Sequence, residues 1–243
     1  MIKINQLCKS YQDKVILSDI NLSIKENTVT TFFGPNGCGK STLMRLVAGL
    51  DKPNKGSITK IDNNHIPIVF QNYRQSLLPW YDAKKNITFP LILNGLSNDE
   101  IEKKLCELLD IFPISFSLND KVYNLSGGQA QLVCILRALI IKPKILIFDE
   151  PFSAIDYMSS LELRDKVISI AKKMDTTILF ISHDLDEAVY ISDKIVFMKR
   201  DPGIIVSELD TNFPEDRSAD FIGSVQFAEK KLQALQLFRE TIK

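Results

Sequence analysis

The segment Gly34-Pro35-Asn36-Gly37-Cys38-Gly39-Lys40-Ser41-Thr42 has the spacing of a phosphate-binding loop, in which a glycine and four residues precede Gly-Lys-Ser. Glycines let backbone N–H groups approach phosphate oxygens closely, and a helix that starts here adds a favourable partial charge. Lys40 could reach the β and γ oxygens, and Ser41 could bind Mg²⁺. The alternative is an ordinary glycine turn ahead of a helix, but the Lys-Ser-Thr ending favours a nucleotide site.

Two carboxylates follow a short apolar run at residues 145–148. The run predicts a buried parallel strand, and it ends in Asp149 and Glu150. Ligands bind at the carboxyl edge of such sheets. Asp149 would hold Mg²⁺ through water, and Glu150 could polarise an attacking water. An isolated Asp-Glu pair would more often cap a helix, but the phosphate loop upstream favours catalysis.

Further polar residues follow other predicted strands. His183 comes after the apolar run 178–181, so it should reach the edge that bears the two acids, although a lone histidine is usually structural. Gln71 ends the run 66–70 and could bind the same metal through its side-chain carbonyl, or be a surface residue. Tyr11 lies in the first loop, where its ring could stack on adenine or pack at the edge of a sheet.

A second glycine-containing segment, Ser126-Gly127-Gly128-Gln129, opens a predicted helix. Ser126 and Gln129 could form a capping box, which is the purely structural interpretation. Two consecutive glycines are a costly way merely to start a helix. Bare amides at a helix N-terminus suit an anion, so the sequence favours a phosphate contact here.

The elements that carry these residues predict an α/β fold. Residues 28–33 and 195–198 add two buried strands to those already named, while the alternating runs 2–7 and 19–24 predict an antiparallel sheet beside the core. Residues of about 87 to 141 have helical patterns and form an inserted lobe. We therefore expect one nucleotide-binding domain over residues 1–210, followed by a tail, residues 211–243, with an amphipathic helix.

Composition excludes several classes of protein. The 243 residues are 45% hydrophobic, and 30 basic residues balance 30 acidic ones, which disfavours a nucleic-acid partner. The four cysteines have no paired spacing, which favours reduced thiols over disulfides or zinc. No apolar run approaches the roughly 20 residues that span a bilayer, and the first residues do not resemble a signal peptide. If this protein works at a membrane, another subunit must hold it there.

The order of these motifs resembles that in the nucleotide-binding subunits of ABC transporters. The order is the phosphate loop, Gln71, Leu125-Ser126-Gly127-Gly128-Gln129, the strand ending in Asp149 and Glu150, Ser153-Ala154-Ile155-Asp156 and His183. The resemblance covers residues 1–210 and implies a P-loop NTPase (RecA-like) core. It also implies an ATPase in which two copies pair head to tail around two ATP molecules with Mg²⁺. One chain would contribute residues 34–42, Tyr11, Gln71, Asp149, Glu150 and His183. The other would contribute residues 126–129, and Asp156 would link the two sites.

Shorter cues refine the resemblance. Leu77-Leu78-Pro79-Trp80, Asn86-Ile87 and Arg200-Asp201-Pro202-Gly203 resemble bacterial importers of nitrate, sulfonate, taurine and thiamine-precursor type. That similarity implies transmembrane permease subunits, a solute-binding protein and a location at the cytoplasmic face of the membrane. Leu78 and Trp80 could then contact the permease, or pack the hinge of the lobe. The rivals are a DNA-repair or chromosome-type ATPase and a soluble regulatory ATPase.

One departure from the family pattern concerns backbone geometry. Asn27 stands where a glycine is usual, just before the first core strand. Asparagine tolerates left-handed backbone angles better than most residues. We therefore expect the turn to survive the substitution.

Overall fold

The computed structural model describes residues 1–60, 65–152, 155–214 and 219–242. Its main sheet has six strands in the order β5-β6-β7-β3-β8-β9. Every pair in it is parallel except the one between β8 and β9 at the edge. The strands span Val29–Phe33 (β3), Ile68–Phe70 (β5), Ile145–Asp149 (β6), Thr177–Ser182 (β7), Lys194–Lys199 (β8) and Ile204–Asp210 (β9).

Register brings the ends of four strands to one edge of this sheet. Phe33 pairs with Ser182, Asp149 pairs with Ile181, and Phe70 pairs with Asp149. The chain leaves each of these strands at the same level, because parallel neighbours end together. The phosphate loop, His183, the two acids and Gln71 therefore all follow strands at this edge, as the sequence predicted.

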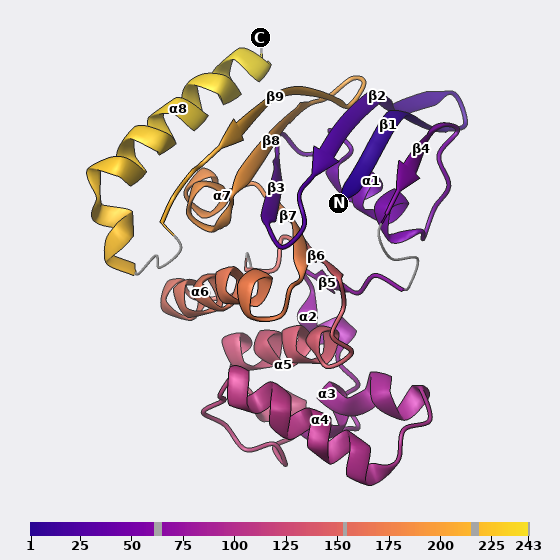
Figure 1. The fold of residues 1–243 in the computed structure, drawn as a ribbon, viewed down its shortest axis with the longest axis vertical. Coiled ribbons are helices and arrows are strands. Elements are labelled where there is room, and N and C mark those ends of the chain that lie inside the picture. The colour runs from indigo at the N-terminus through magenta and orange to yellow at the C-terminus, as the bar shows by residue number, and fades with distance from the viewer. Residues whose placement is uncertain (61–64, 153–154, 215–218, 243) are drawn as a thin grey trace.

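A separate antiparallel sheet in the order β2-β1-β4 lies beside β3 and α1 (Figure 1). Its strands are Ile2–Tyr11 (β1), Lys14–Ile24 (β2) and Lys55–Thr59 (β4). Their apolar side chains join α1, Lys40–Ala48, in a hydrophobic cluster on one side of the main sheet. Asn27, just after β2, has φ 56°, which confirms the left-handed turn.

The helical lobe hangs below the sheets (Figure 1). It contains Tyr73–Ser76 (α2), Ala83–Leu93 (α3), Asn98–Ile111 (α4), the short 3-10 turn Val122–Asn124 and Gly127–Leu139 (α5). The first long helix thus begins slightly before residue 87. The buried residues of the lobe belong to the same hydrophobic cluster as the helices Tyr157–Lys173 (α6) and Leu185–Ile191 (α7) and the other side of the main sheet. The α/β fold with an antiparallel sheet and an inserted helical lobe is therefore confirmed.

The remaining helices cover the main sheet on that second side. They are Tyr157–Lys173 (α6), Leu185–Ile191 (α7), the 3-10 turn Ala219–Gly223 and Val225–Ile242 (α8). The ring of Phe238 on α8 lies edge-on against Phe33, with 4.9 Å between ring centroids. The C-terminal helix therefore packs onto the core. In the part of the chain that the structure describes, no helix is both long and apolar enough to cross a membrane.

Candidate functional site

The loop between β3 and α1 is shaped by close backbone contacts. A Cβ on Gly34 would lie 2.3 Å from the carbonyl oxygen of Met198, so only glycine fits there. Gly39 has φ 96°, a left-handed conformation that glycine adopts without strain. Gly39 is also the residue before α1, and no described side chain caps that helix. The first N–H groups of α1 thus remain available at the end of the loop.

Lys40 bends back over this loop. Its Nζ donates to the carbonyl oxygens of Gly34 at 2.7 Å and Pro35 at 3.1 Å, and the residue is only 6% exposed. The ammonium group is thus held at the loop by neutral acceptors. A buried cation beside a helix N-terminus gives this loop a positive character that suits an anion.

Ser41 and Asp149 meet at the sheet edge. Ser41 Oγ donates to Asp149 Oδ1 at 3.3 Å, and burial raises the pKa of Asp149. Gln71 follows Phe70, the partner of Asp149 in the sheet, and is exposed. Across the described ranges, no cluster of three His, Cys, Asp or Glu side chains could hold a metal. The hydroxyl, carboxylate and amide oxygens here fit Mg²⁺, which takes few protein ligands and keeps water.

Glu150 and His183 form a direct contact, although they lie on different strand ends. His183 Nδ1 is 3.0 Å from Glu150 Oε2, and the two side chains are 56% and 20% exposed. Glu150 has φ 50°, which is costly for a residue other than glycine, and its N–H donates to Ile181. Glu150 in this left-handed conformation directly follows β6, and its side chain contacts His183 after the neighbouring strand β7. A carboxylate paired with a partly exposed imidazole can accept a proton from water.

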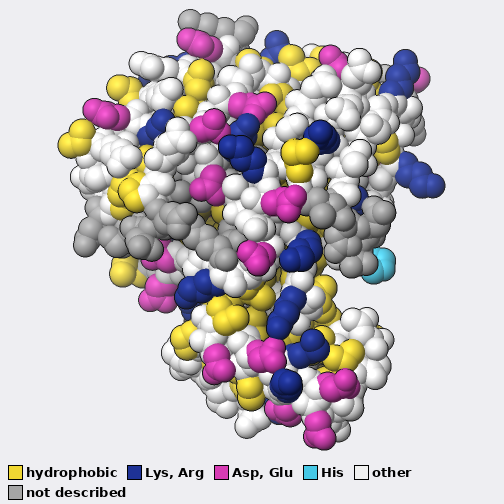
Figure 2. All heavy atoms as spheres, viewed as in Figure 1, with side chains coloured by type: hydrophobic (Ala, Val, Ile, Leu, Met, Phe, Trp, Pro, Cys, Tyr) yellow, Lys and Arg dark blue, Asp and Glu magenta, His cyan; other side chains and the backbone are white. Residues whose placement is uncertain are grey.

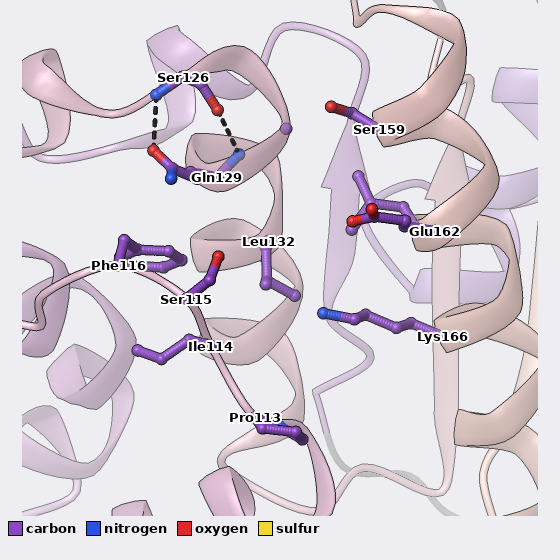
Figure 3. A pocket seen from close by; sticks show the side chains of 12 residues that line it. Pro113, Ile114, Ser115, Phe116, Ser126, Gln129, Leu132, Ser159, Glu162 and Lys166 are labelled. Carbon is purple, nitrogen blue, oxygen red and sulfur yellow. Dashed lines mark hydrogen bonds between the residues drawn. The ribbon is translucent and has the colours of Figure 1, made fainter.

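The Ser126 turn forms the capping box that the structural interpretation predicted. Ser126 N–H donates to Gln129 Oε1 at 2.9 Å, and Gln129 N–H donates to Ser126 Oγ at 3.3 Å (Figure 3). Ser126 is exposed and Gln129 half-buried, so the turn faces outward. It borders a cavity of 520 Å³ between α5, α6 and residues 113–116, into which Glu162 and Lys166 point from α6 (Figure 3).

The two glycines of this turn also have a packing role, which the sequence argument missed. A Cβ on Gly128 would lie 2.8 Å from Ser159 Cβ, and one on Gly127 would lie 2.9 Å from Tyr73 Oη. The glycines therefore let α5 approach α6 and α2 closely. Close packing, as well as the predicted anion contact, therefore explains why two conformationally costly glycines stand at the start of this helix.

We predict that Gly128→Ala lowers the free energy of unfolding by roughly 1–3 kcal/mol, because the new methyl group must push α6 away. Ser159→Gly removes the opposing Cβ and should recover much of the loss in the double variant. Urea unfolding of the two single variants and the double variant measures this coupling. Strictly additive effects would contradict the steric explanation.

The contacts of Tyr11 and Asp156 lie outside the group of residues at the sheet edge. Tyr11 ends β1 and is 43% exposed; its hydroxyl donates to Asp51, and Lys9 Nζ lies 4.6 Å from its ring centroid. Asp156 is the N-cap of α6 and accepts from Ser159 N–H at 3.0 Å. This backbone contact lowers the pKa of Asp156. Ser153 and Ala154 of the same motif lie outside the described residues.

Sequence reasoning missed a buried carboxyl group beside His183. Glu187 on α7 is 6% exposed, and its Oε2 accepts from Ser182 Oγ. Burial raises the pKa of Glu187 to about 7, although the Ser182 hydrogen bond and the Arg164 guanidinium lower it in part. The signal that could have found Glu187 is its place directly before the apolar run 188–191, on the face of the helix that meets the core.

The raised pKa of Glu187 predicts that the free energy of unfolding depends on pH. Between its ordinary value of 4.5 and about 7, folded Glu187 keeps a proton that the unfolded chain has lost. Its contribution to the free energy of unfolding is therefore present below pH 4.5 and is lost as the pH rises through 7, by at most about 3 kcal/mol. Glu187→Gln should remove this slope. Urea unfolding of both chains at pH 5 and pH 8 measures the difference, and parallel profiles would contradict the prediction.

The two halves of the predicted site lie in different parts of one chain. The phosphate loop, Asp149, Glu150 and His183 gather at the edge of the main sheet. The Ser126 turn opens α5, which lies in the helical lobe below the sheets (Figure 1). The structure thus brings the first group together within one chain and leaves the Ser126 turn at a separate exposed position.

Comparisons with known proteins identify similar chains. The sequence profile of the family described as ABC transporter matches residues 17–153. The chain is 38% identical over 211 residues to an aliphatic sulfonates import ATP-binding protein, SsuB 2, of Pseudomonas syringae pv. tomato, covering 86% of this chain and 88% of that one. It is 34% identical over 220 residues to a taurine import ATP-binding protein, TauB, of Yersinia pestis, covering 88% and 85%.

Solved structures agree in fold. One is cbiO1 from Clostridium perfringens, part of the ABC transporter complex cbiONQ, with a TM-score of 0.80 and 28% identity over 99% of this chain and 96% of that one. Another is a dimeric ATP-binding cassette in a post-hydrolysis state bound to ADP and Pi, with a TM-score of 0.72 and 29% identity over 86% and 98%.

Proposed function

The chain belongs to the ABC transporter family and is an ATPase, and we propose that it is the ATP-hydrolysing subunit of a bacterial importer that works as a head-to-tail dimer. One observation carries the proposal. Within a single chain, the loop, the Ser41 and Asp149 oxygens and the Glu150–His183 pair meet at one sheet edge, while the outward-facing Ser126 turn is on a different lobe. Two antiparallel copies could bring each turn to the other copy's loop.

The residues of one chain would then bind ATP as follows. The N–H groups of residues 34–42 and the Lys40 ammonium would hold the phosphates, and Tyr11 would stack on the base. Ser41, Asp149 and Gln71 would hold Mg²⁺, which neutralises charge on the phosphate oxygens. Glu150 would accept the proton of the attacking water, and His183 would hold Glu150 and the γ-phosphate in place.

The second chain would complete the site. The helix N-terminus at Ser126, Gly127, Gly128 and Gln129 would contact the γ-phosphate, and Asp156 would link the two sites. Because this contact needs the γ-phosphate, ATP would favour the closed dimer and hydrolysis the open one. Permease subunits could convert that shift into transport.

We place the subunit at the cytoplasmic face of the membrane, held there by permease subunits. The relatives named for sulfonate and taurine import support a small-solute importer that works with a solute-binding protein. Of the two candidates for a permease contact, Trp80 is 66% exposed and Leu78 is half-buried, so Trp80 is the better one. On the face shown in Figure 2, acidic and basic side chains are interspersed, which gives no support to a nucleic-acid partner.

Co-purification tests the proposal. The chain should be recovered with a multi-spanning permease, and the ATPase rate of the reconstituted complex should rise with one solute and its binding protein from a panel of sulfonates, taurine, nitrate and thiamine precursors. ATPase activity that DNA stimulates would instead support the chromosome-type alternative. Activity without any membrane partner would support a soluble regulatory ATPase.

A further inference from the structure

Two buried ionisable residues lie beside the turn that carries His183. Glu187 on α7 and Arg164 on α6 are 6% and 7% exposed. Charged side chains are rarely buried to this extent unless they are paired. Neither residue belongs to the set predicted to touch ATP. The contacts of Arg164 and Glu187 therefore indicate which part of the structure these two side chains hold in place.

The side chain of Glu187 contacts the residue before His183, and its backbone contacts the residue after it. Its Oε2 accepts from the hydroxyl of Ser182, the residue before His183. Asp184, the residue after His183, accepts from the backbone N–H of Glu187 at 3.2 Å. The Ser182 hydroxyl oxygen also accepts from Asp184 N–H at 3.0 Å. The turn 182–184 is thus tied to the first turn of α7.

Arg164 ties the same turn to α6. Its Nη2 lies 3.5 Å from Glu187 Oε1 and 3.9 Å from Asp184 Oδ2. The guanidinium therefore faces a carboxylate from the residue after His183 and another from α7. Arg164 lies about two turns into α6, so this contact connects the middle of α6 with the His183 turn.

We propose that Arg164 and Glu187 are positioning residues that hold His183 against Glu150. The His183 ring is 56% exposed, so its 3.0 Å contact with Glu150 depends on the backbone that carries it. The proposal rests on the proposed function, in which this pair acts on ATP. It adds that a displacement of α6 when the dimer closes would also move His183, because Arg164 joins the two.

Kinetics test the proposal in the full chain. Arg164→Met and Glu187→Met should each lower kcat about tenfold, a fraction of the 10²–10⁴ typical of acid–base catalysis, with KM for ATP within about twofold of the wild type. The double variant should be no slower than either single variant, since the two residues act as one unit. Glu187→Gln, which still accepts from Ser182, should recover part of the rate.

Nuclear magnetic resonance tests the position of His183 without ATP. The chain has two histidines, and the other, His65, is exposed and serves as an internal reference. In Arg164→Met and Glu187→Met, the ring resonances of His183 should move toward those of His65 as the Glu150 contact is lost. The His65 resonances should not move.

Tyr190→Phe is a matched control. Tyr190 Oη donates to Asp165 Oδ1 at 2.5 Å and so forms another, partly buried polar contact between α7 and α6. Its loss should lower the free energy of unfolding but leave kcat and the His183 resonances unchanged. If Tyr190→Phe lowered kcat and moved the His183 resonances as the methionine variants do, Arg164 and Glu187 would only stabilise the fold. That result would overturn the proposal.

Unchanged His183 resonances and kcat in folded Arg164→Met and Glu187→Met chains would also overturn it. If either methionine variant fails to fold, Arg164→Lys, which keeps the charge, or Glu187→Gln, which keeps the shape, takes its place. The His183 resonances and kcat of that variant then decide. A wild-type chain that does not hydrolyse ATP would contradict the proposed function alone, because the resonance measurement needs no turnover.

Discussion

Glu150→Gln is expected to bind ATP as tightly as the wild type while losing about 10²–10⁴-fold in turnover. Glutamine has the shape of glutamate and can keep the 3.0 Å contact with His183, but it cannot take a proton from water. The phosphate loop and Lys40 are untouched, so binding should persist. ATP should then accumulate between two chains, because the bond whose cleavage opens the dimer stays intact. Phosphate release and equilibrium nucleotide binding measure the two effects.

The control is Glu107→Gln, which removes a carboxylate from α4 that pairs with Lys142 at the surface of the helical lobe. It should hydrolyse ATP at the wild-type rate. Normal turnover by Glu150→Gln would refute the assignment of Glu150 as the base. Loss of ATP binding in the same variant would show that Glu150 matters chiefly for the shape of the loop.

Lys40→Ala should abolish measurable ATP binding. The Nζ group supplies the buried positive charge of the loop, and losing a desolvated charge contact costs about 2–5 kcal/mol, or roughly 30- to several-thousand-fold in affinity. Lys60→Ala is a matched control, because Lys60 Nζ donates to the Val47 carbonyl near the other end of α1 at 2.9 Å. Calorimetric titration with ATP compares them, and equal affinities would count against the loop as the phosphate site.

Much of this architecture could be predicted because each buried parallel strand corresponds to a short, mostly apolar run in the sequence. Four of these runs lead into the phosphate loop, Gln71, Asp149 or Ser182-His183, so their shared sheet edge could be predicted from the sequence. Asn27 was predictable for a local reason, since its left-handed angle depends on its own backbone. Strands β4 and β9 were not predicted. β4 is almost wholly exposed and β9 is a half-exposed edge strand, so neither carries a buried apolar pattern.

Contacts between distant segments were harder to predict. The sequence placed His183 and Glu150 at one edge, but it predicted neither their direct contact nor the left-handed backbone of Glu150. The closeness of Gly128 to Ser159 needs the crossing of α5 and α6. Arg164 and Glu187 look like ordinary surface charges on amphipathic helices until α6 and α7 are packed together. The roles of the individual site residues stay predictions.

Sedimentation of the Glu150→Gln chain, with and without ATP, tests most directly whether nucleotide joins two copies through the Ser126 turn. The decisive comparison uses two double variants, in which Ser126→Asp or Ser126→Asn is added to Glu150→Gln. Both residues cap helices as well as serine does, so α5 should keep its start, but only aspartate places a negative charge against the partner's phosphates. We predict that ATP doubles the sedimenting mass from 27.6 kDa in Glu150→Gln and in the asparagine variant, and that the aspartate variant stays a monomer although it binds ATP. A dimer that forms without ATP, or equally in all three chains, would contradict the account.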